Sequence, residues 1–140
     1  MVNKNKKDLI IFCGIPASGK TTLSKQVAEE NNANRYSFDE MRCLQHKELI
    51  PHIKQSLMSG ANTVVDSTYT LKRARTDLLE AIKDIDCRKT LIFMNTPLEE
   101  CIRRNNQREY PVAQHLVESI SSSMQPPSID EGWDEIIYLK

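Results

Sequence analysis

Short segments that favour β-strands alternate along the chain with longer segments in which apolar residues recur every three or four positions. The strand-like segments are 8–13, 35–38, 62–65, 90–94 and 135–139. The first of them is almost entirely apolar and shows no alternation, which is typical of a central parallel strand covered on both faces. We therefore expect a sheet of five strands with helices on both of its faces.

The helical period predicts five helices between these strands. The first helix follows Gly19 and ends near Asn31, and the second, over 41–59, is interrupted at Pro51. The other three cover 71–82, begin at Thr96, and extend from Pro111 to Met124. In the last helix, residues 112, 116, 120 and 124 are expected to face inward. Strands that alternate with helices favour right-handed crossovers and a parallel sheet. We therefore predict one α/β domain over residues 1–140, with three layers in the order α/β/α.

The start of the fourth helix carries its own signal. The sequence there matches a capping box, with Thr96 as the N-cap residue and Glu99 as the glutamate at the third helical position. Pro97 takes the first helical position, which favours proline. This pattern predicts that the Thr96 side chain caps the helix.

The loop after the first strand carries the clearest chemical motif. Gly14-Ile15-Pro16-Ala17-Ser18-Gly19-Lys20-Thr21 matches G-x-x-x-x-G-K-[ST], between a predicted buried strand and a predicted helix. In this motif the glycines let the backbone turn so that N–H groups point at phosphate oxygens, and the helix adds its positive end. Lys20 can reach the β- and γ-phosphates, and Thr21 can offer its hydroxyl to Mg²⁺. We predict that this loop, extended to Thr22, binds the phosphates of a nucleotide.

Two carboxylates follow predicted strands, at the edge of an open α/β sheet where ligands bind. Asp39 comes after the sequence RYSF, and Asp66 comes after NTVV. Asp39 is the candidate general base that accepts the proton of an acceptor hydroxyl, or alternatively the N-cap of a helix that begins at Met41. Asp66 is the candidate residue that holds Mg²⁺ or its water ligands, or alternatively a turn-forming residue. The two functional roles can also be exchanged between these carboxylates.

Three groups of arginines are candidates for binding phosphate groups. Arg42 lies three residues after the candidate base, on the same face of a predicted helix, so that it can clamp an anionic group of the acceptor. Arg104 and Arg108 are four residues apart and share a predicted helical face, where two guanidinium groups suit a phosphoryl group in transfer. Arg73, within a basic cluster over 72–75, can follow a phosphodiester backbone. Each of these arginines can alternatively be a solvated surface cation.

Composition and charge limit the class of protein. Nineteen basic residues balance nineteen acidic ones, which argues against a broad surface that coats nucleic acid but leaves room for a local basic groove. The four cysteines form no C-x-x-C pair, so we expect reduced and mostly buried thiols in a cytoplasmic protein. No apolar run approaches the length of a membrane span, so no membrane partner is expected. The three histidines are isolated in the sequence, and we assign no chemistry to them.

The order of the motifs is distinctive: GIPASGKTT, FDEMR, VVDST and RNNQR, with a proline-initiated helix after the last one. In this order the chain resembles the branch of P-loop kinases that contains bacteriophage-type polynucleotide 5′-kinases and the kinase modules of RNA repair enzymes. The resemblance covers nearly the whole chain. It implies a parallel sheet in the order 2-3-1-4-5 and a small helical lid at about 97–111.

The resemblance also implies a role for each matching residue. Lys20 and Thr21 would bind the donor phosphates and Mg²⁺, and Asp39 would activate the 5′-hydroxyl. Arg42 would contact the neighbouring phosphate of the acceptor, and Asp66 would support the metal or the acceptor. Arg104 and Arg108 would belong to the lid over the donor.

These observations predict an ATP-dependent kinase that uses Mg²⁺ and phosphorylates a hydroxyl group, with the 5′-hydroxyl end of RNA or DNA as the first choice of acceptor. The second choice is a kinase of the same branch that acts on a nucleoside or another small molecule. A nucleotide-binding switch or NTPase without an acceptor, and an inactive P-loop protein, are rival classes. A GTPase switch would carry N-K-x-D after a strand, whereas residues 94–97 read MNTP.

Overall fold

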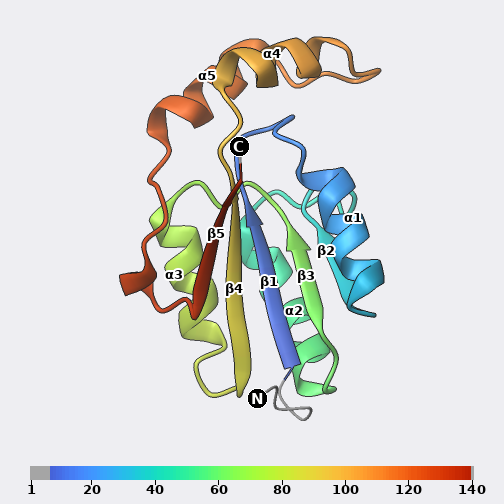
Figure 1. The fold of residues 1–140 in the computed structure, drawn as a ribbon, viewed down its shortest axis with the longest axis vertical. Coiled ribbons are helices and arrows are strands. Elements are labelled where there is room, and N and C mark those ends of the chain that lie inside the picture. Colours follow the sequence, from blue (N-terminus) through green and yellow to red (C-terminus); the bar gives the residue numbers. More distant parts are fainter. Residues whose placement is uncertain (1–6, 140) are drawn as a thin grey trace.

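The computed structural model of the protein describes residues 7–139, so residues 1–6 and 140 of the predicted domain lie outside the described residues. Its five strands form one parallel sheet in the order β2-β3-β1-β4-β5, which confirms the predicted order (Figure 1). The strands are β1 (Lys7–Cys13), β2 (Asn34–Ser37), β3 (Thr63–Asp66), β4 (Cys87–Met94) and β5 (Glu135–Leu139). As its unbroken apolar sequence predicts, β1 lies in the centre of the sheet.

Helices cover both faces of this sheet. The α-helices are α1 (Lys20–Glu30), α2 (Ile50–Met58), α3 (Lys72–Ala81), α4 (Leu98–Asn106) and α5 (Gln114–Ser123), and two short 3₁₀-helices are η1 (His46–Leu49) and η2 (Ile129–Glu131). Successive residues of a strand point to opposite faces. Accordingly, Leu9 and Ile11 of β1 join an apolar cluster that contains Leu78 of α3, whereas Phe12 joins a second cluster that contains Ala28 of α1. The sheet is therefore the middle layer of the predicted three-layer arrangement.

The helices α4 and α5 lie beyond the carboxyl ends of the strands (Figure 1). They pack on each other through Cys101 and Val117, which form a separate apolar cluster with Ile15 of the loop after β1. Because Ile15 belongs to the phosphate-binding motif, this cluster anchors the helical pair directly on that loop. The helix α4 and the turn after it occupy the range predicted for the lid, and α5 belongs to the same helical unit.

The predicted helix over 41–59 is wrong at its start. Residues 38–45 form turns and irregular backbone, and helical structure begins only at His46. Arg42 has a φ of 55°, which a right-handed helix cannot accommodate. Asp39 therefore caps no helix at Met41, and Arg42 does not share a helical face with it. Pro51 lies in the first turn of α2, where a missing N–H breaks no hydrogen bond.

Three predictions about the later helices are also wrong. The capping box at Thr96 does not form, because Pro97 is the N-cap residue and the Thr96 hydroxyl instead donates to the carbonyl oxygen of Ser18 at 2.9 Å. The last helix begins at Gln114 rather than at Pro111. In α5, Val117 is buried, whereas Leu116, which the helical spacing predicts to face inward, is 48% exposed. Both segments contact the loop after β1, Thr96 through Ser18 and Val117 through the apolar cluster that contains Ile15.

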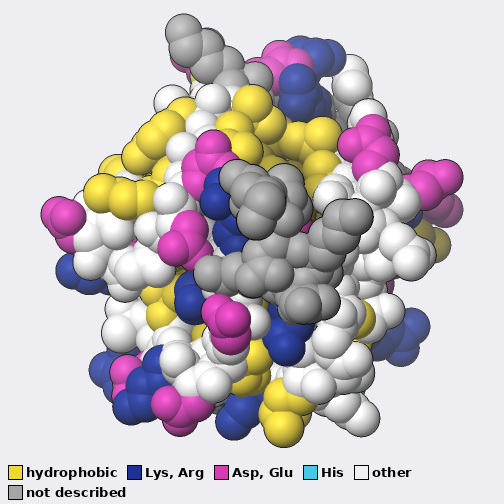
Figure 2. Space-filling model, turned by 60° about the horizontal axis from the view of Figure 1, so that its bottom comes forward, with side chains coloured by type: hydrophobic (Ala, Val, Ile, Leu, Met, Phe, Trp, Pro, Cys, Tyr) yellow, Lys and Arg dark blue, Asp and Glu magenta, His cyan; other side chains and the backbone are white. Residues whose placement is uncertain are grey.

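The cysteines and the surface agree with the composition. All four cysteines are free thiols, and three of them are buried, as predicted. None of the helices in the described part of the chain is both long and apolar enough to span a bilayer. On the face shown in Figure 2, Lys and Arg side chains are interspersed with Asp and Glu side chains rather than gathered into one basic surface.

Candidate functional site

The loop between β1 and α1 is a tight turn that few side chains would permit. A Cβ atom on Gly14 would lie 2.8 Å from Ser18 Oγ and 3.0 Å from the Met94 carbonyl oxygen, so only glycine fits there. Gly19 has a φ of 105°, which also favours glycine, and α1 begins at the next residue. The N–H groups in the first turn of a helix have no partner within the helix. The loop and the start of the helix therefore have the backbone geometry that the motif predicts, while the binding of phosphate there stays a prediction.

Lys20 is held inside this loop. Its Nζ donates to the carbonyl oxygens of Gly14 and Ile15, at 2.9 Å each. The side chain is buried, and this burial lowers the pKa of Lys20, while the nearby carboxylate of Asp66 acts in the opposite direction. A buried ammonium group that contacts only neutral oxygens lacks a counter-charge in direct contact. A phosphate group bound in the loop would supply that counter-charge.

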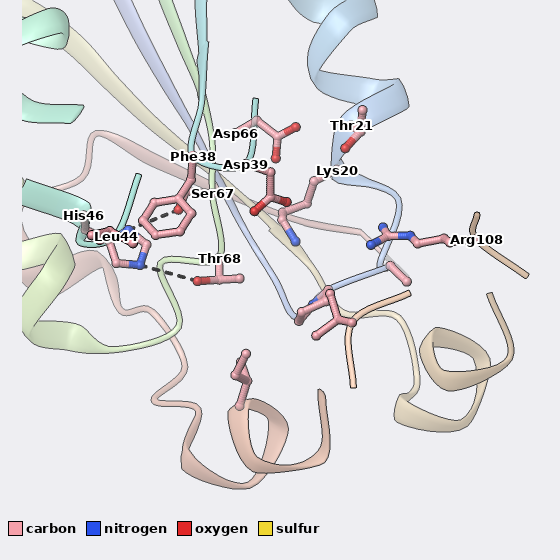
Figure 3. Close-up of a pocket in the computed structure, with 14 residues that line it drawn as sticks. Lys20, Thr21, Phe38, Asp39, Leu44, His46, Asp66, Ser67, Thr68 and Arg108 are labelled. Atoms are coloured by element: carbon pink, nitrogen blue, oxygen red, sulfur yellow. Dashed lines mark hydrogen bonds between the residues drawn. The ribbon is translucent and has the colours of Figure 1, made fainter. Parts of the chain in front are cut away.

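Lys20 lines two cavities. The larger has a volume of about 360 Å³ and lies toward β2 and β3, where Phe38, Asp39 and Asp66 line it (Figure 3). The smaller has a volume of about 240 Å³ and lies between the start of α1 and the lid. Four residues line both cavities: Ala17, Lys20, Thr21 and Arg108. A group bound beside Lys20 would therefore border both cavities.

The two predicted carboxylates line the larger cavity in very different surroundings. Asp39 is exposed, and its carboxylate forms no hydrogen bond or ion pair with the described residues. Asp66 is only 5% exposed, and its Oδ2 accepts hydrogen bonds from Arg35 Nη2 at 2.8 Å and from Ser24 Oγ at 3.1 Å. Figure 3 shows both carboxylates on the same side of Lys20. The structure thus brings together the two candidates for the base and for the metal-holding residue.

The two lid arginines reach the smaller cavity from different local structures. Arg104 lies in α4, where its Nε donates to Glu100 Oε1 at 3.0 Å, and its Nη1 lies 3.6 Å from the position of a Cβ on Gly19. Because α4 ends at Asn106, Arg108 lies in the turn after the helix, so the prediction of a shared helical face is wrong. Both arginines nevertheless line the smaller cavity. They place two positive charges opposite the start of α1.

Two predicted acceptor-binding residues lie elsewhere. Arg42 is in the turn after β2, and Arg73 is exposed in the first turn of α3. Neither lines the two cavities around Lys20. The basic cluster 72–75 is also divided, because Arg75 is fully buried and pairs with Glu131. A contact between Arg42 or Arg73 and a substrate stays a prediction.

His46, to which no chemistry was assigned from the sequence, lines the larger cavity (Figure 3). Its Nδ1 lies 3.1 Å from Ser67 Oγ, and its ring lies between Phe38 and Tyr69, with centroid distances of 5.0 and 4.7 Å. Burial lowers the pKa of His46, which favours a neutral ring. Its partners come from distant segments, so no local spacing indicates its place in the site.

The parallel sheet, the loop after its central strand and the lid opposite define a P-loop nucleotide-binding protein. The family model described as AAA domain matches residues 9–127, and the chain belongs to this family. This range includes every residue that the sequence predicts for the site. Among curated proteins, the chain is similar to L-seryl-tRNA(Sec) kinase from Methanococcus maripaludis, with 27% identity over 143 residues that cover 90% of this chain and 56% of that relative. The chain thus spans about half the length of the relative.

Solved structures show the same fold at low sequence identity. Chaetomium thermophilum Kti12 in complex with ADP-AlF3 superposes with a TM-score of 0.80 at 18% identity, covering 94% of this chain and 88% of that one. A fungal RNA kinase has a TM-score of 0.75 at 16% identity, with 99% and 76% covered. A sugar kinase from Janibacter has a TM-score of 0.70 at 17% identity, with 95% and 84% covered. At these levels of identity, the superpositions show that the three proteins share the fold of this chain.

Proposed function

We propose that this protein is an ATP-dependent kinase that transfers the γ-phosphate to a hydroxyl group, and that the acceptor is the 5′-hydroxyl end of a polynucleotide. One observation carries this proposal: Lys20 and Arg108 line two cavities at once, with Asp39, whose carboxylate has no ion pair within the described residues, in one cavity and Arg104 in the other. A site that only holds a nucleotide needs the smaller cavity alone. The larger cavity, with a free carboxylate facing it, is what an acceptor requires.

The donor occupies the smaller cavity in this proposal. Residues 14–22 surround the phosphates of ATP, with the backbone of Gly14 to Gly19 and the side chains of Lys20, Thr21 and Thr22. Arg104 and Arg108 close over them from the lid. The γ-phosphate then lies beside Lys20, between the two cavities.

Mg²⁺ fits the side chains at the boundary between the cavities. This ion is usually bound through one or two protein oxygen ligands, together with substrate phosphates and water. The hydroxyl of Thr21 and the carboxylate of Asp66 line the same cavity and supply such oxygens. Among residues 7–139, no group of three or more His, Cys, Asp or Glu residues could hold a metal ion by itself. We therefore expect Mg²⁺ to bind together with the nucleotide, where it neutralises phosphate charge.

The transfer uses the side chains already in place. Asp39 accepts the proton of the acceptor hydroxyl, whose oxygen forms a bond to the γ-phosphorus while the bond from that phosphorus to the β–γ bridging oxygen breaks. ADP leaves with the electron pair of the broken bond. Lys20, Arg104 and Arg108 stabilise the negative charge on the transferring group.

The walls of the larger cavity favour a nucleic acid as the acceptor. Phe38, Leu44 and Val112 give it apolar surface, while Ser67 and Thr68 supply hydroxyls next to Asp39. Apolar and aromatic side chains bind nucleobases by stacking and packing, whereas a sugar is bound mainly through polar groups. The similarity to a fungal RNA kinase and to a seryl-tRNA kinase supports the same choice. Because a sugar kinase shares the fold, a small-molecule acceptor is the second candidate.

The test is phosphoryl transfer from γ-labelled ATP with Mg²⁺ to a panel of acceptors: 5′-hydroxyl RNA, 5′-hydroxyl DNA, nucleosides and sugars. We expect label on the polynucleotide ends. Asp39→Asn should lower kcat by roughly 10²- to 10⁴-fold without weakening ATP binding, and Lys20→Ala should abolish transfer. Glu40→Gln, next to the proposed base, is the matched control and should retain activity.

Three outcomes would contradict this proposal. Label on nucleosides or sugars alone would replace the polynucleotide by a small molecule. Steady phosphate release that needs no acceptor would indicate an NTPase. Full activity of Asp39→Asn would remove this residue from the role of base.

A further inference from the structure

Arg35 of β2 is an unassigned residue next to the proposed site. It lines neither of the two cavities around Lys20, and its side chain is only 13% exposed. Each of its donor nitrogens has a partner: Nε donates to Ser24 Oγ at 2.9 Å, Nη2 to Asp66 Oδ2 at 2.8 Å and Nη1 to Glu40 Oε2 at 2.6 Å. An arginine with all three nitrogens occupied has a fixed orientation.

Two of the three contacts of Arg35 lead to one oxygen of Asp66, one directly and one through Ser24. The Ser24 hydroxyl also lies 3.1 Å from Asp66 Oδ2, so α1, β2 and β3 meet at this atom. The other oxygen, Oδ1, forms no hydrogen bond within the described residues, although Asp66 lines the larger cavity. Hydrogen bonds therefore fix the orientation of the carboxylate through Oδ2, and Oδ1 can still bind a ligand.

Arg35 also gives the three carboxylates at the ends of two adjacent strands different surroundings. It forms ion pairs with Asp66 and with Glu40, and leaves Asp39, the direct neighbour of Glu40, without an ion pair in the described part of the chain. Hydrogen bonding to Arg35 lowers the pKa of Glu40, which is consistent with a formed ion pair. Asp39 is thus the carboxylate at this edge that is free to exchange a proton with a substrate.

We propose that Arg35 is a positioning residue that gives the two site carboxylates different roles. It holds Asp66 in one orientation, with Oδ1 left for the Mg²⁺ that would bind with the nucleotide. With Oδ2 occupied by Arg35 and Ser24 and Oδ1 taken by that metal ion, Asp66 would have no oxygen left for the proton of the acceptor hydroxyl, and this role falls to Asp39. This inference rests on the proposed kinase function, and it answers which of the two carboxylates is the base.

The experiment measures ATP binding by calorimetry with and without Mg²⁺, as the ratio of the two Kd values. The variants are Arg35→Gln, which removes the charge but keeps a hydrogen-bonding side chain, Arg35→Lys, Asp66→Asn and the double variant of Arg35→Gln with Asp66→Asn. Loss of a side chain that orients a metal ligand lowers metal affinity by about 10- to 100-fold. We expect Arg35→Gln to reduce the Mg²⁺ effect on the Kd of ATP by about tenfold, and Arg35→Lys to restore most of it.

The double variant separates positioning from a general loss of stability. If Arg35 acts through Asp66, adding Arg35→Gln to Asp66→Asn should change the Mg²⁺ effect by less than about twofold, because coupled residues are not additive. Glu40→Gln removes the other ion pair of Arg35 and should leave the Mg²⁺ effect as in the wild type. Circular dichroism at the same temperature confirms that each variant is folded.

Two results would overturn this inference: a wild-type Mg²⁺ effect in Arg35→Gln, or an equal loss in the Asp66→Asn background. Neither depends on the acceptor, so a failure of the proposed kinase function remains distinguishable. A protein that transfers no phosphate to any acceptor but shows the expected binding pattern would refute the function and retain the role of Arg35. A protein that phosphorylates RNA but shows an unchanged Mg²⁺ effect in Arg35→Gln would retain the function and refute the role of Arg35.

Discussion

The guanidinium group of Arg75 forms two hydrogen bonds with the carboxylate of Glu131, from Nε to Oε1 at 2.8 Å and from Nη2 to Oε2 at 2.9 Å. Its Nη1 donates to the carbonyl oxygen of Tyr69, also at 2.8 Å. This arginine is fully buried, and it joins α3 and η2 to the segment that follows Asp66. The ion pair therefore supports the loop that carries Ser67 and Thr68 into the larger cavity.

Breaking this ion pair should destabilise the protein strongly. Glu131→Ala leaves the Arg75 charge buried and unpaired, and such a loss typically costs about 3–5 kcal/mol. We expect a drop of this size in the free energy of unfolding, measured by urea denaturation. Glu135→Ala is the matched control, because it removes the exposed ion pair with Arg88 and should change stability by less than about 1 kcal/mol. Equal effects of the two substitutions would contradict the importance of burial.

The histidine in the larger cavity should make stability depend on pH. Burial lowers the pKa of His46 below its ordinary value of 6.5, so the unfolded chain binds a proton more readily than the folded protein does. The contribution of His46 to stability is therefore complete above pH 6.5 and is lost as the pH falls below that value. We expect a smaller decrease in Tm between about pH 7.5 and 5.5 for His46→Phe than for the wild type.

His115 provides the control for that measurement, since it is exposed on α5. His115→Phe should show the same pH dependence of Tm as the wild type. A His46→Phe variant with an unchanged pH dependence would mean that other groups dominate the acid side of the stability curve.

The glycines of the chain should differ in what they contribute. A Cβ at Gly14 meets Ser18 Oγ at 2.8 Å and Met94 Cβ at 3.0 Å, so Gly14→Ala must distort the phosphate-binding loop. We expect it to cost about 1–3 kcal/mol of stability and to abolish the rise in Tm that ATP with Mg²⁺ produces. Gly60 has a φ of 88° but no atom within 4 Å of an added Cβ. Gly60→Ala should cost about 1–2 kcal/mol of stability and keep the rise in Tm that ATP produces. A normal rise in Tm with ATP in Gly14→Ala would argue against the loop as the phosphate site.

Neighbouring arginines of the lid should have unequal effects on turnover. Arg103 and Arg104 both bind Glu100, but only Arg104 lines the cavity beside the start of α1. Arg104→Ala should therefore lower kcat by about 10²- to 10³-fold, whereas Arg103→Ala should stay close to the wild type. Steady-state kinetics at saturating ATP make the comparison. Similar losses in both variants would indicate that Glu100 and the helix, rather than a direct contact with the nucleotide, explain the effect.

Much of the fold follows from local sequence. The unbroken apolar run of β1 can be buried only in the centre of a sheet covered on both faces, and the alternation of strands and helices then favours a parallel sheet. The motif from Gly14 to Thr21 is equally local, since a phosphate cradle of backbone N–H groups depends on consecutive residues. Asp39 and Asp66 are predictable for a related reason, because parallel strands bring their carboxyl ends to one edge.

The contacts that the polar side chains make become known only from the tertiary structure. The sequence predicts a helix at Arg42, but the chain turns there with a positive φ. It predicts that the Thr96 hydroxyl caps a helix, but this hydroxyl donates to Ser18, a contact across 78 positions of the chain. Arg35 meets Asp66 only because β2 and β3 are adjacent in the sheet. The parallel sheet and the phosphate loop thus follow from the amino-acid sequence, because they depend on local period and spacing. The contacts of the charged residues instead join segments that are distant in the chain, and no local pattern encodes them.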